Sequence, residues 1–159
     1  SGVLCIFRSD FIQMNQQEVQ LQIVNQVFQD GGDERYEVAT DGILTTKGES
    51  FYLAYTETLT EQPDTKVVFK FKGDQVTINR HNVTKTRMVF EMGLVDHQPY
   101  QTVAGMMILA TNTQKMEIEF DETTGTGQLD LSYSLSANGD VVGQYQVALQ
   151  FGPKSSILN

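Results

Sequence analysis

Apolar and polar residues alternate along most of the chain between Glu18 and Phe151, in runs that each end in a turn sequence. Alternation with a period of two places every second side chain on the same face of a β-strand. About eight or nine such runs occur, and the segments between them lack a helical period. Successive strands with one buried face each are typical of an antiparallel barrel or sandwich. The pattern therefore predicts an all-β, antiparallel, up-and-down barrel.

The turn sequences divide the chain into individual strands. We expect strands over residues 18–28, 34–46, 50–58, 66–72, 76–80, 84–92 and 129–135, and a last strand that ends at Phe151. Residues 93–99 are expected to form a loop, and residues 100–122 either one long bent strand or two short ones. Asn138-Gly139 is the strongest hairpin signal. Asp41-Gly42 lies inside the second strand, where it predicts a bulge or a sharp bend.

Length and cysteine content narrow the class of protein. A chain of 159 residues fits one domain, and its one cysteine, Cys5, excludes an internal disulfide bond. This favours a reducing, cytoplasmic location. No apolar run approaches the ~20 residues of a membrane-spanning helix. We interpret Met14 as the native start, with residues 1–13 as a cloning remnant or upstream tail and residues 14–159 as the barrel domain.

Charge is distributed unevenly along this acidic chain. The net charge is −9, but residues 64–87 hold six Lys and Arg against two acids, a net of +4, which leaves −13 for the remainder. An acidic domain is a poor match for nucleic acid. The basic side chains on the predicted strands are either a surface for an acidic protein partner or ordinary solvated strand faces. They are Lys66, Lys70, Lys72, Lys85 and Arg87.

Glu57 and Arg80 are the first candidates for a functional site. Each continues the apolar phase of its strand, so each should point into the barrel. Their two strands run in the same direction in a meander, with one strand between them, which places the backbones roughly 10 Å apart. Long side chains can close that gap. The pair is either a structural ion pair or an anchor at which Arg80 binds a ligand carboxylate or phosphate.

Hydroxyl groups from other strands can add to the same interior. Tyr55, Tyr100, Thr102 and Tyr133 are candidates for this role, and the alternative is that the tyrosines are core residues. The two histidines and one cysteine do not form a metal-binding pattern, and we expect no metal or cofactor. Neither a nucleophile elbow nor a phosphate-binding glycine loop is present, so we do not expect an enzyme.

Several segments together resemble a known family. They are Gly42 with Lys47, the stretch 52–57, Arg80, the stretch 100–105 and Tyr133. From about Glu18 onward the chain resembles DUF1934, a small family of unknown function found mainly in Gram-positive bacteria. The resemblance implies a calycin-like barrel, the architecture of lipocalins and fatty-acid-binding proteins. It implies no activity or ligand. The chain lacks the Gly-x-Trp start of secreted lipocalins, because it contains no tryptophan.

These observations favour a non-enzymatic binding protein. We expect a small, mostly apolar ligand with an anionic group, anchored by Arg80 and supported by Glu57 and the tyrosine hydroxyls. The alternative is a protein-interaction module with a filled barrel, which binds an acidic partner through its basic outer strand face. The sequence leaves open whether the chain forms a homodimer. It predicts no membrane association.

Overall fold

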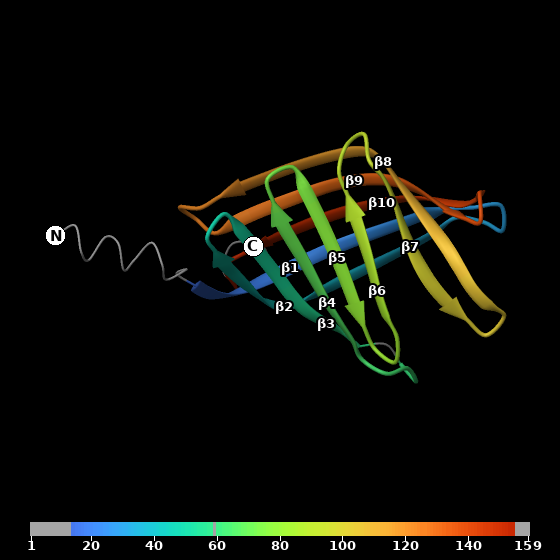
Figure 1. Cartoon of the computed structure of the whole chain (residues 1–159). Coiled ribbons are helices and arrows are strands. Elements are labelled where there is room, and N and C mark those ends of the chain that lie inside the picture. The colour runs from blue at the N-terminus through green and yellow to red at the C-terminus, as the bar shows by residue number, and fades with distance from the viewer. Residues whose placement is uncertain (1–13, 59, 155–159) are drawn as a thin grey trace, which may run out of the picture.

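The computed structural model describes residues 14–58 and 60–154, which form ten β-strands (Figure 1). The strands are β1 (Met14–Phe28), β2 (Glu34–Lys47), β3 (Ser50–Glu57), β4 (Thr65–Lys72), β5 (Gln75–His81), β6 (Lys85–Phe90), β7 (Val95–Thr102), β8 (Gly105–Asp121), β9 (Thr126–Ala137) and β10 (Asp140–Gly152). Their order in the sheet is β6-β5-β4-β3-β2-β1-β10-β9-β8-β7. All neighbouring strands are antiparallel, so the predicted all-β, up-and-down fold is confirmed.

The barrel is nearly closed. Its gap lies between β6 and β7, which are consecutive along the chain. The first and last strands pair along their length, with Ile23 opposite Leu149. In the described residues β6 and β7 form no ladder with each other, which leaves a seam between β6 and the β7–β8 hairpin. Side chains bridge this seam. The Val89 N–H donates to Asp96 Oδ2 at 3.2 Å, and the Glu91 N–H donates to Thr113 Oγ1 at 3.3 Å.

The strand count differs from the expected eight or nine because of β7. We expected a loop at 93–99, but most of this stretch is strand, paired with β8. The segment 100–122 accordingly divides, with a turn at 103–104 between the two strands. Because β7 carries few apolar residues and contains Pro99, its sequence has no clear alternation, and its pairing with β8 stabilises it instead.

Aromatic rings fill one end of the barrel. Phe51 stacks on Phe71 with ring centroids 4.6 Å apart and on Phe120 at 4.4 Å, and Phe151 packs against all three. The end that these four residues define, called here the phenylalanine end, also holds the β2–β3, β4–β5 and β8–β9 turns. Between this end and the opposite one the interior is packed with buried aliphatic and aromatic side chains.

Two predictions from glycine positions, one of a hairpin and one of a bulge or bend, have different outcomes. The predicted hairpin is present, with Asn138 and Gly139 both at positive φ (51° and 91°) between β9 and β10. Of the bulge or sharp bend predicted at Asp41-Gly42, the bulge is absent from the β1–β2 ladder, because these strands pair without a register shift there. A Cβ on Gly42 would lie 2.8 Å from the Ala54 carbonyl oxygen, so this glycine permits close packing of β2 against β3. Register shifts occur instead at 113–115 and 141–143.

Two other expectations concern the N-terminal tail and membrane-spanning helices. The interpretation of residues 1–13 as a tail lies outside the described residues. Across residues 14–58 and 60–154, no helix is long and apolar enough to cross a bilayer.

Candidate functional site

Tyrosines gather at the end of the barrel opposite the phenylalanine end. Tyr55 follows Leu53 on the inner face of β3, and Tyr133 follows Leu131 on the inner face of β9. Tyr145 pairs with Tyr133 across the β9–β10 ladder. Tyr36 and Tyr145 interact electrostatically, as do Tyr133 and Tyr145. These four tyrosines, together with Glu57 and Arg80, are called here the tyrosine end.

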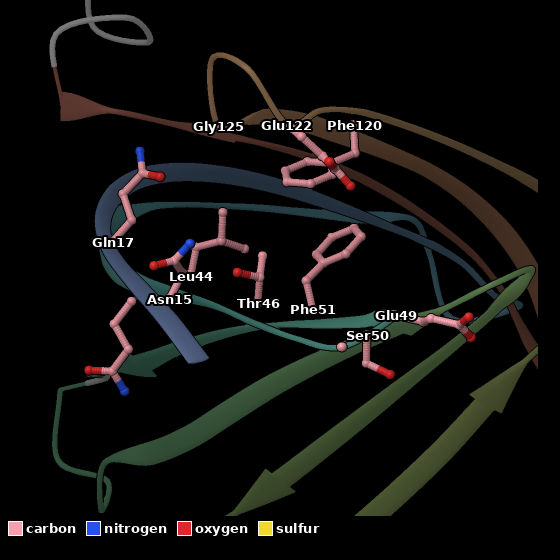
Figure 2. Close-up of a pocket in the computed structure, with 12 residues that line it drawn as sticks. Asn15, Gln17, Leu44, Thr46, Glu49, Ser50, Phe51, Phe120, Glu122 and Gly125 are labelled. Atoms are coloured by element: carbon pink, nitrogen blue, oxygen red, sulfur yellow. The ribbon is translucent and has the colours of Figure 1, made fainter. Parts of the chain in front are cut away.

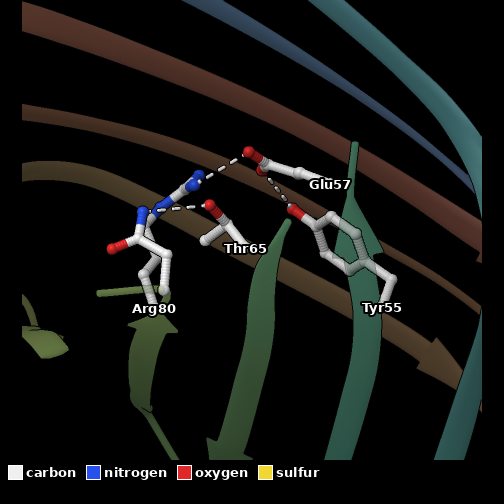
Figure 3. Close-up of polar contacts among 5 residues, drawn as sticks. Tyr55, Glu57, Thr65 and Arg80 are labelled. Atoms are coloured by element: carbon white, nitrogen blue, oxygen red, sulfur yellow. Dashed lines mark hydrogen bonds and ion pairs between the residues drawn. The ribbon is translucent and has the colours of Figure 1, made fainter. Parts of the chain in front are cut away.

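The predicted pairing of Glu57 with Arg80 is confirmed. Arg80 Nη1 lies 3.0 Å from Glu57 Oε2, and the Tyr55 hydroxyl donates to Glu57 Oε1 at 3.3 Å (Figure 3). The ladder explains this meeting, because β4 lies between the two strands, with Thr65 opposite Glu57 and Val67 opposite Arg80. The carboxylate thus bridges a phenol and a guanidinium that come from different strands.

Exposure differs between the two partners of this ion pair. The Glu57 side chain is 13% exposed, whereas that of Arg80 is 36% exposed. A guanidinium carries five N–H donors. Within the described residues, the Arg80 guanidinium makes one hydrogen bond, which goes to Glu57. Its remaining donors can therefore reach solvent or a ligand at the tyrosine end.

Protonation at this end is set by burial and by the ion pair. Burial raises the pKa of Tyr55, and the negative charge of Glu57 raises it further. Burial likewise raises the pKa of Tyr133, against a lowering effect of Arg80. Burial acts to lower the pKa of Arg80, but the hydrogen bond and charge of Glu57 outweigh it, and the pKa is raised. At neutral pH the site therefore presents neutral phenols beside a cationic guanidinium.

Two residues of this end were absent from the sequence-based site. The Tyr145 ring stacks on Tyr133 with centroids 5.0 Å apart and an interplanar angle of 6°. The Tyr36 hydroxyl donates to Glu34. Tyr145 shares the inward phase of Val147 and Leu149, so the alternation contained the signal. Sequence reasoning missed it because tyrosine also fits an ordinary core position.

Among the described residues, Tyr100 and Thr102 form no hydrogen bond with Glu57 or Arg80, and their part in this site stays a prediction. The Thr102 hydroxyl donates to the Gly105 carbonyl at 2.7 Å and accepts from the Ala104 N–H at 3.2 Å. It is therefore used within the β7–β8 turn. Tyr100 lies on β7, across the seam, and is 36% exposed.

Basic side chains cover the outer face of β4 and β6. Lys66 faces His81 on β5, which in turn faces Lys85 on β6, so one row crosses three strands. None of the basic residues in this patch forms an ion pair with another described residue. The patch, called here the basic face, consists of Lys66, Lys70, Lys72, Lys85 and Arg87.

Comparison with known proteins identifies a family for this architecture. The family model DUF1934, described as a domain of unknown function, matches residues 21–149. The crystal structure of the YwiB protein from Bacillus subtilis shares the fold, with a TM-score of 0.75 and 21% sequence identity over 92% of this chain and 98% of that chain. No curated protein matches the chain. Since the family model covers most of its length, the chain belongs to the DUF1934 family.

Proposed function

We propose that this chain is a non-enzymatic binding protein for a small ligand with an apolar body and an anionic group. The ligand would sit at the tyrosine end of the barrel. The observation that carries this proposal is the state of Arg80. Glu57 orients its guanidinium, which is 36% exposed and keeps N–H donors without a hydrogen-bond partner among the described residues.

The chemistry of the surrounding residues suits such a ligand. A guanidinium binds carboxylate, phosphate or sulfonate through paired N–H donors. The stacked rings of Tyr133 and Tyr145 offer apolar surface, and neutral phenols donate hydrogen bonds. Glu57 accepts one hydrogen bond from the guanidinium, and its charge balances the cation when the site is empty. Glu57 is therefore a positioning residue in this proposal, and Arg80 is the ligand anchor.

Two fluorescent probes that differ in one charge test the proposal. We expect 8-anilinonaphthalene-1-sulfonate to bind, and Arg80→Met to weaken its binding about ten-fold, which corresponds to about 1.4 kcal/mol. N-phenyl-1-naphthylamine has the same rings without the sulfonate. Its affinities for the variant and for the unsubstituted protein should agree within about two-fold, because charge-assisted hydrogen bonds from Arg80 contribute only to binding of the anionic probe. Fluorescence titration measures both affinities.

Arg87→Met is the matched control, because Arg87 is an exposed cation on the outer face of the neighbouring strand. It should leave both affinities unchanged, and thermal unfolding shows whether each variant is folded. Equal weakening of the two probes by Arg80→Met, or equal weakening of the anionic probe by Arg87→Met, would exclude Arg80 as the anchor.

A second candidate function is protein interaction through the basic face. Its support is the row of cations on β4 and β6 without ion-pair partners among the described residues. We expect an acidic partner to bind more weakly as ionic strength rises, because exposed charges are screened within about 10 Å at 0.1 M salt. Titration of a candidate partner at several salt concentrations measures this, and a salt-insensitive complex would remove the basic face from consideration.

A further inference from the structure

Two cavities meet at the phenylalanine end of the barrel, and Phe120 lines both. The first has a volume of about 640 Å³ and lies between the start of β1, the β2–β3 turn and the β8–β9 turn. The second, of about 770 Å³, lies between the β4–β5 turn, the end of β6 and β8. Each is partly open to solvent. Phe120 is the partition between them, so a ligand that displaces this ring can extend through both.

The first cavity is polar around an aromatic wall. Figure 2 shows Glu122 and Phe120 on one side, with Phe51 and Glu49 coming from the β3 side. Amide and hydroxyl groups complete the lining. They belong to Asn15, Gln16, Gln17, Thr46 and Ser50. Their oxygen atoms, like the carboxylates, can accept hydrogen bonds from a ligand.

The second cavity lies beside the seam between β6 and β8. Glu91, which follows β6, is hydrogen-bonded to Thr113 on β8 and lines this cavity beside apolar side chains. Met92, Met116 and Ile118 form this wall with Phe120. Methionine is flexible and adapts its shape to different apolar ligands. The exposed position of Met92 is consistent with a lateral opening in the barrel wall.

All charged side chains that line the two cavities are acidic. Each cavity is lined by two carboxylates, Glu49 and Glu122 in the first and Asp74 and Glu91 in the second. Neither lining includes a lysine, arginine or histidine. Gln75 donates a hydrogen bond to Glu91 at 3.3 Å, and none of the four carboxylates forms an ion pair with another described residue. Cavities with this acidic lining favour a cation and disfavour an anion.

We propose that the phenylalanine end binds a cationic amphiphile, an alkylamine in its ammonium form. The ammonium head lies in the first cavity between Glu49 and Glu122, and the alkyl tail passes Phe120 into the apolar wall of the second. This site lies at the opposite end of the barrel from Arg80 and prefers the opposite charge. It is therefore independent of the proposed function and stands or falls separately.

A single tryptophan at the partition provides the test. The chain contains no tryptophan, so Phe120→Trp introduces one reporter between the two cavities. We expect octylammonium to shift its emission in a saturable way, at concentrations at least about ten-fold lower than octanoate, which corresponds to about 1.4 kcal/mol. 1-Octanol, a neutral molecule with the same chain, should fall between the two. All titrations are run near 0.15 M salt, where long-range attraction to the acidic protein is screened.

Paired carboxylate substitutions separate the site from the overall negative charge. In the tryptophan variant, Glu49→Gln with Glu122→Gln should weaken octylammonium binding about ten-fold and leave 1-octanol unchanged. The matched control is Glu117→Gln with Glu119→Gln, which removes the same charge from exposed positions of β8 outside both cavities. It should change neither affinity.

Three results would overturn this proposal. They are equal binding of octanoate and octylammonium, equal weakening by the two glutamine pairs, and no saturable signal with any of the three ligands. Calorimetric titration of the unsubstituted protein with octylammonium chloride provides a readout that does not depend on the tryptophan. Binding there, with loss in the Glu49 and Glu122 double variant alone, supports the site even if Phe120→Trp fails to fold.

Discussion

Replacing Gly127 by alanine is expected to lower the free energy of unfolding by about 2–3 kcal/mol, a large effect for one methyl group. A Cβ at Gly127 would lie 2.3 Å from Phe151 Cζ and 2.7 Å from its Cε1. The Phe151 ring is 1% exposed and is in contact with Phe51, Phe71 and Phe120, so it can move away from the added methyl group only by displacing these rings. Urea unfolding measures the loss.

The cost at Gly127 is steric and does not come from its backbone. This residue lies in β9 opposite Phe151, with φ outside the left-handed region that favours glycine. Alanine would ordinarily stabilise a strand relative to glycine by about 0.5–1 kcal/mol. A destabilised variant therefore reports the clash alone.

Gly31→Ala is the matched control, because nothing lies within 4 Å of the added Cβ and φ is not in the left-handed region. Its effect should stay within about 0.5 kcal/mol. Combining Gly127→Ala with Phe151→Leu should cost less than the sum of the two single variants, because the smaller side chain leaves room for the methyl group. Additive costs, or a stable Gly127→Ala protein, would show that the phenylalanine end is not tightly packed around Phe151.

Much of the fold could be predicted because each strand carries its own signal. The alternation of Val67, Phe69 and Phe71 fixes which face of β4 is buried, and all three residues are buried in the structure. The same phase argument placed Glu57 and Arg80 in the interior, and counting strands in a meander brought them together. These inferences depend on local periodicity and strand order, both of which are properties of the sequence.

Features that depend on how the sheet closes could not be predicted. The seam between β6 and the β7–β8 hairpin arises from the geometry of the whole sheet, and its bridging groups, Asp96 and Thr113, have no distinctive sequence pattern. The two cavities at the phenylalanine end are lined by residues from strands and turns far apart in sequence.

The second large effect concerns the ion pair at the tyrosine end. Arg80→Met is expected to lower the free energy of unfolding by about 2–3 kcal/mol, and Glu57→Gln by only about 1 kcal/mol. The asymmetry follows from exposure, because Glu57 is 13% exposed and Arg80 36%. Loss of the arginine leaves a largely buried carboxylate with the Tyr55 hydroxyl as its hydrogen-bond donor. Loss of the carboxylate leaves a guanidinium that reaches water.

Chemical unfolding of the two single variants and the double variant measures this asymmetry and the coupling between the residues. The double variant should be more stable than Arg80→Met alone. Arg80→Met leaves the Glu57 carboxylate without its cationic partner, and Glu57→Gln removes that unpaired negative charge. Arg87→Met, on the outer face, should cost less than about 0.5 kcal/mol. Equal costs for the two single variants would mean that water reaches both partners equally. In that case Glu57 would not hold Arg80 in place, and the guanidinium would be an ordinary surface cation and not an oriented anchor for an anionic ligand.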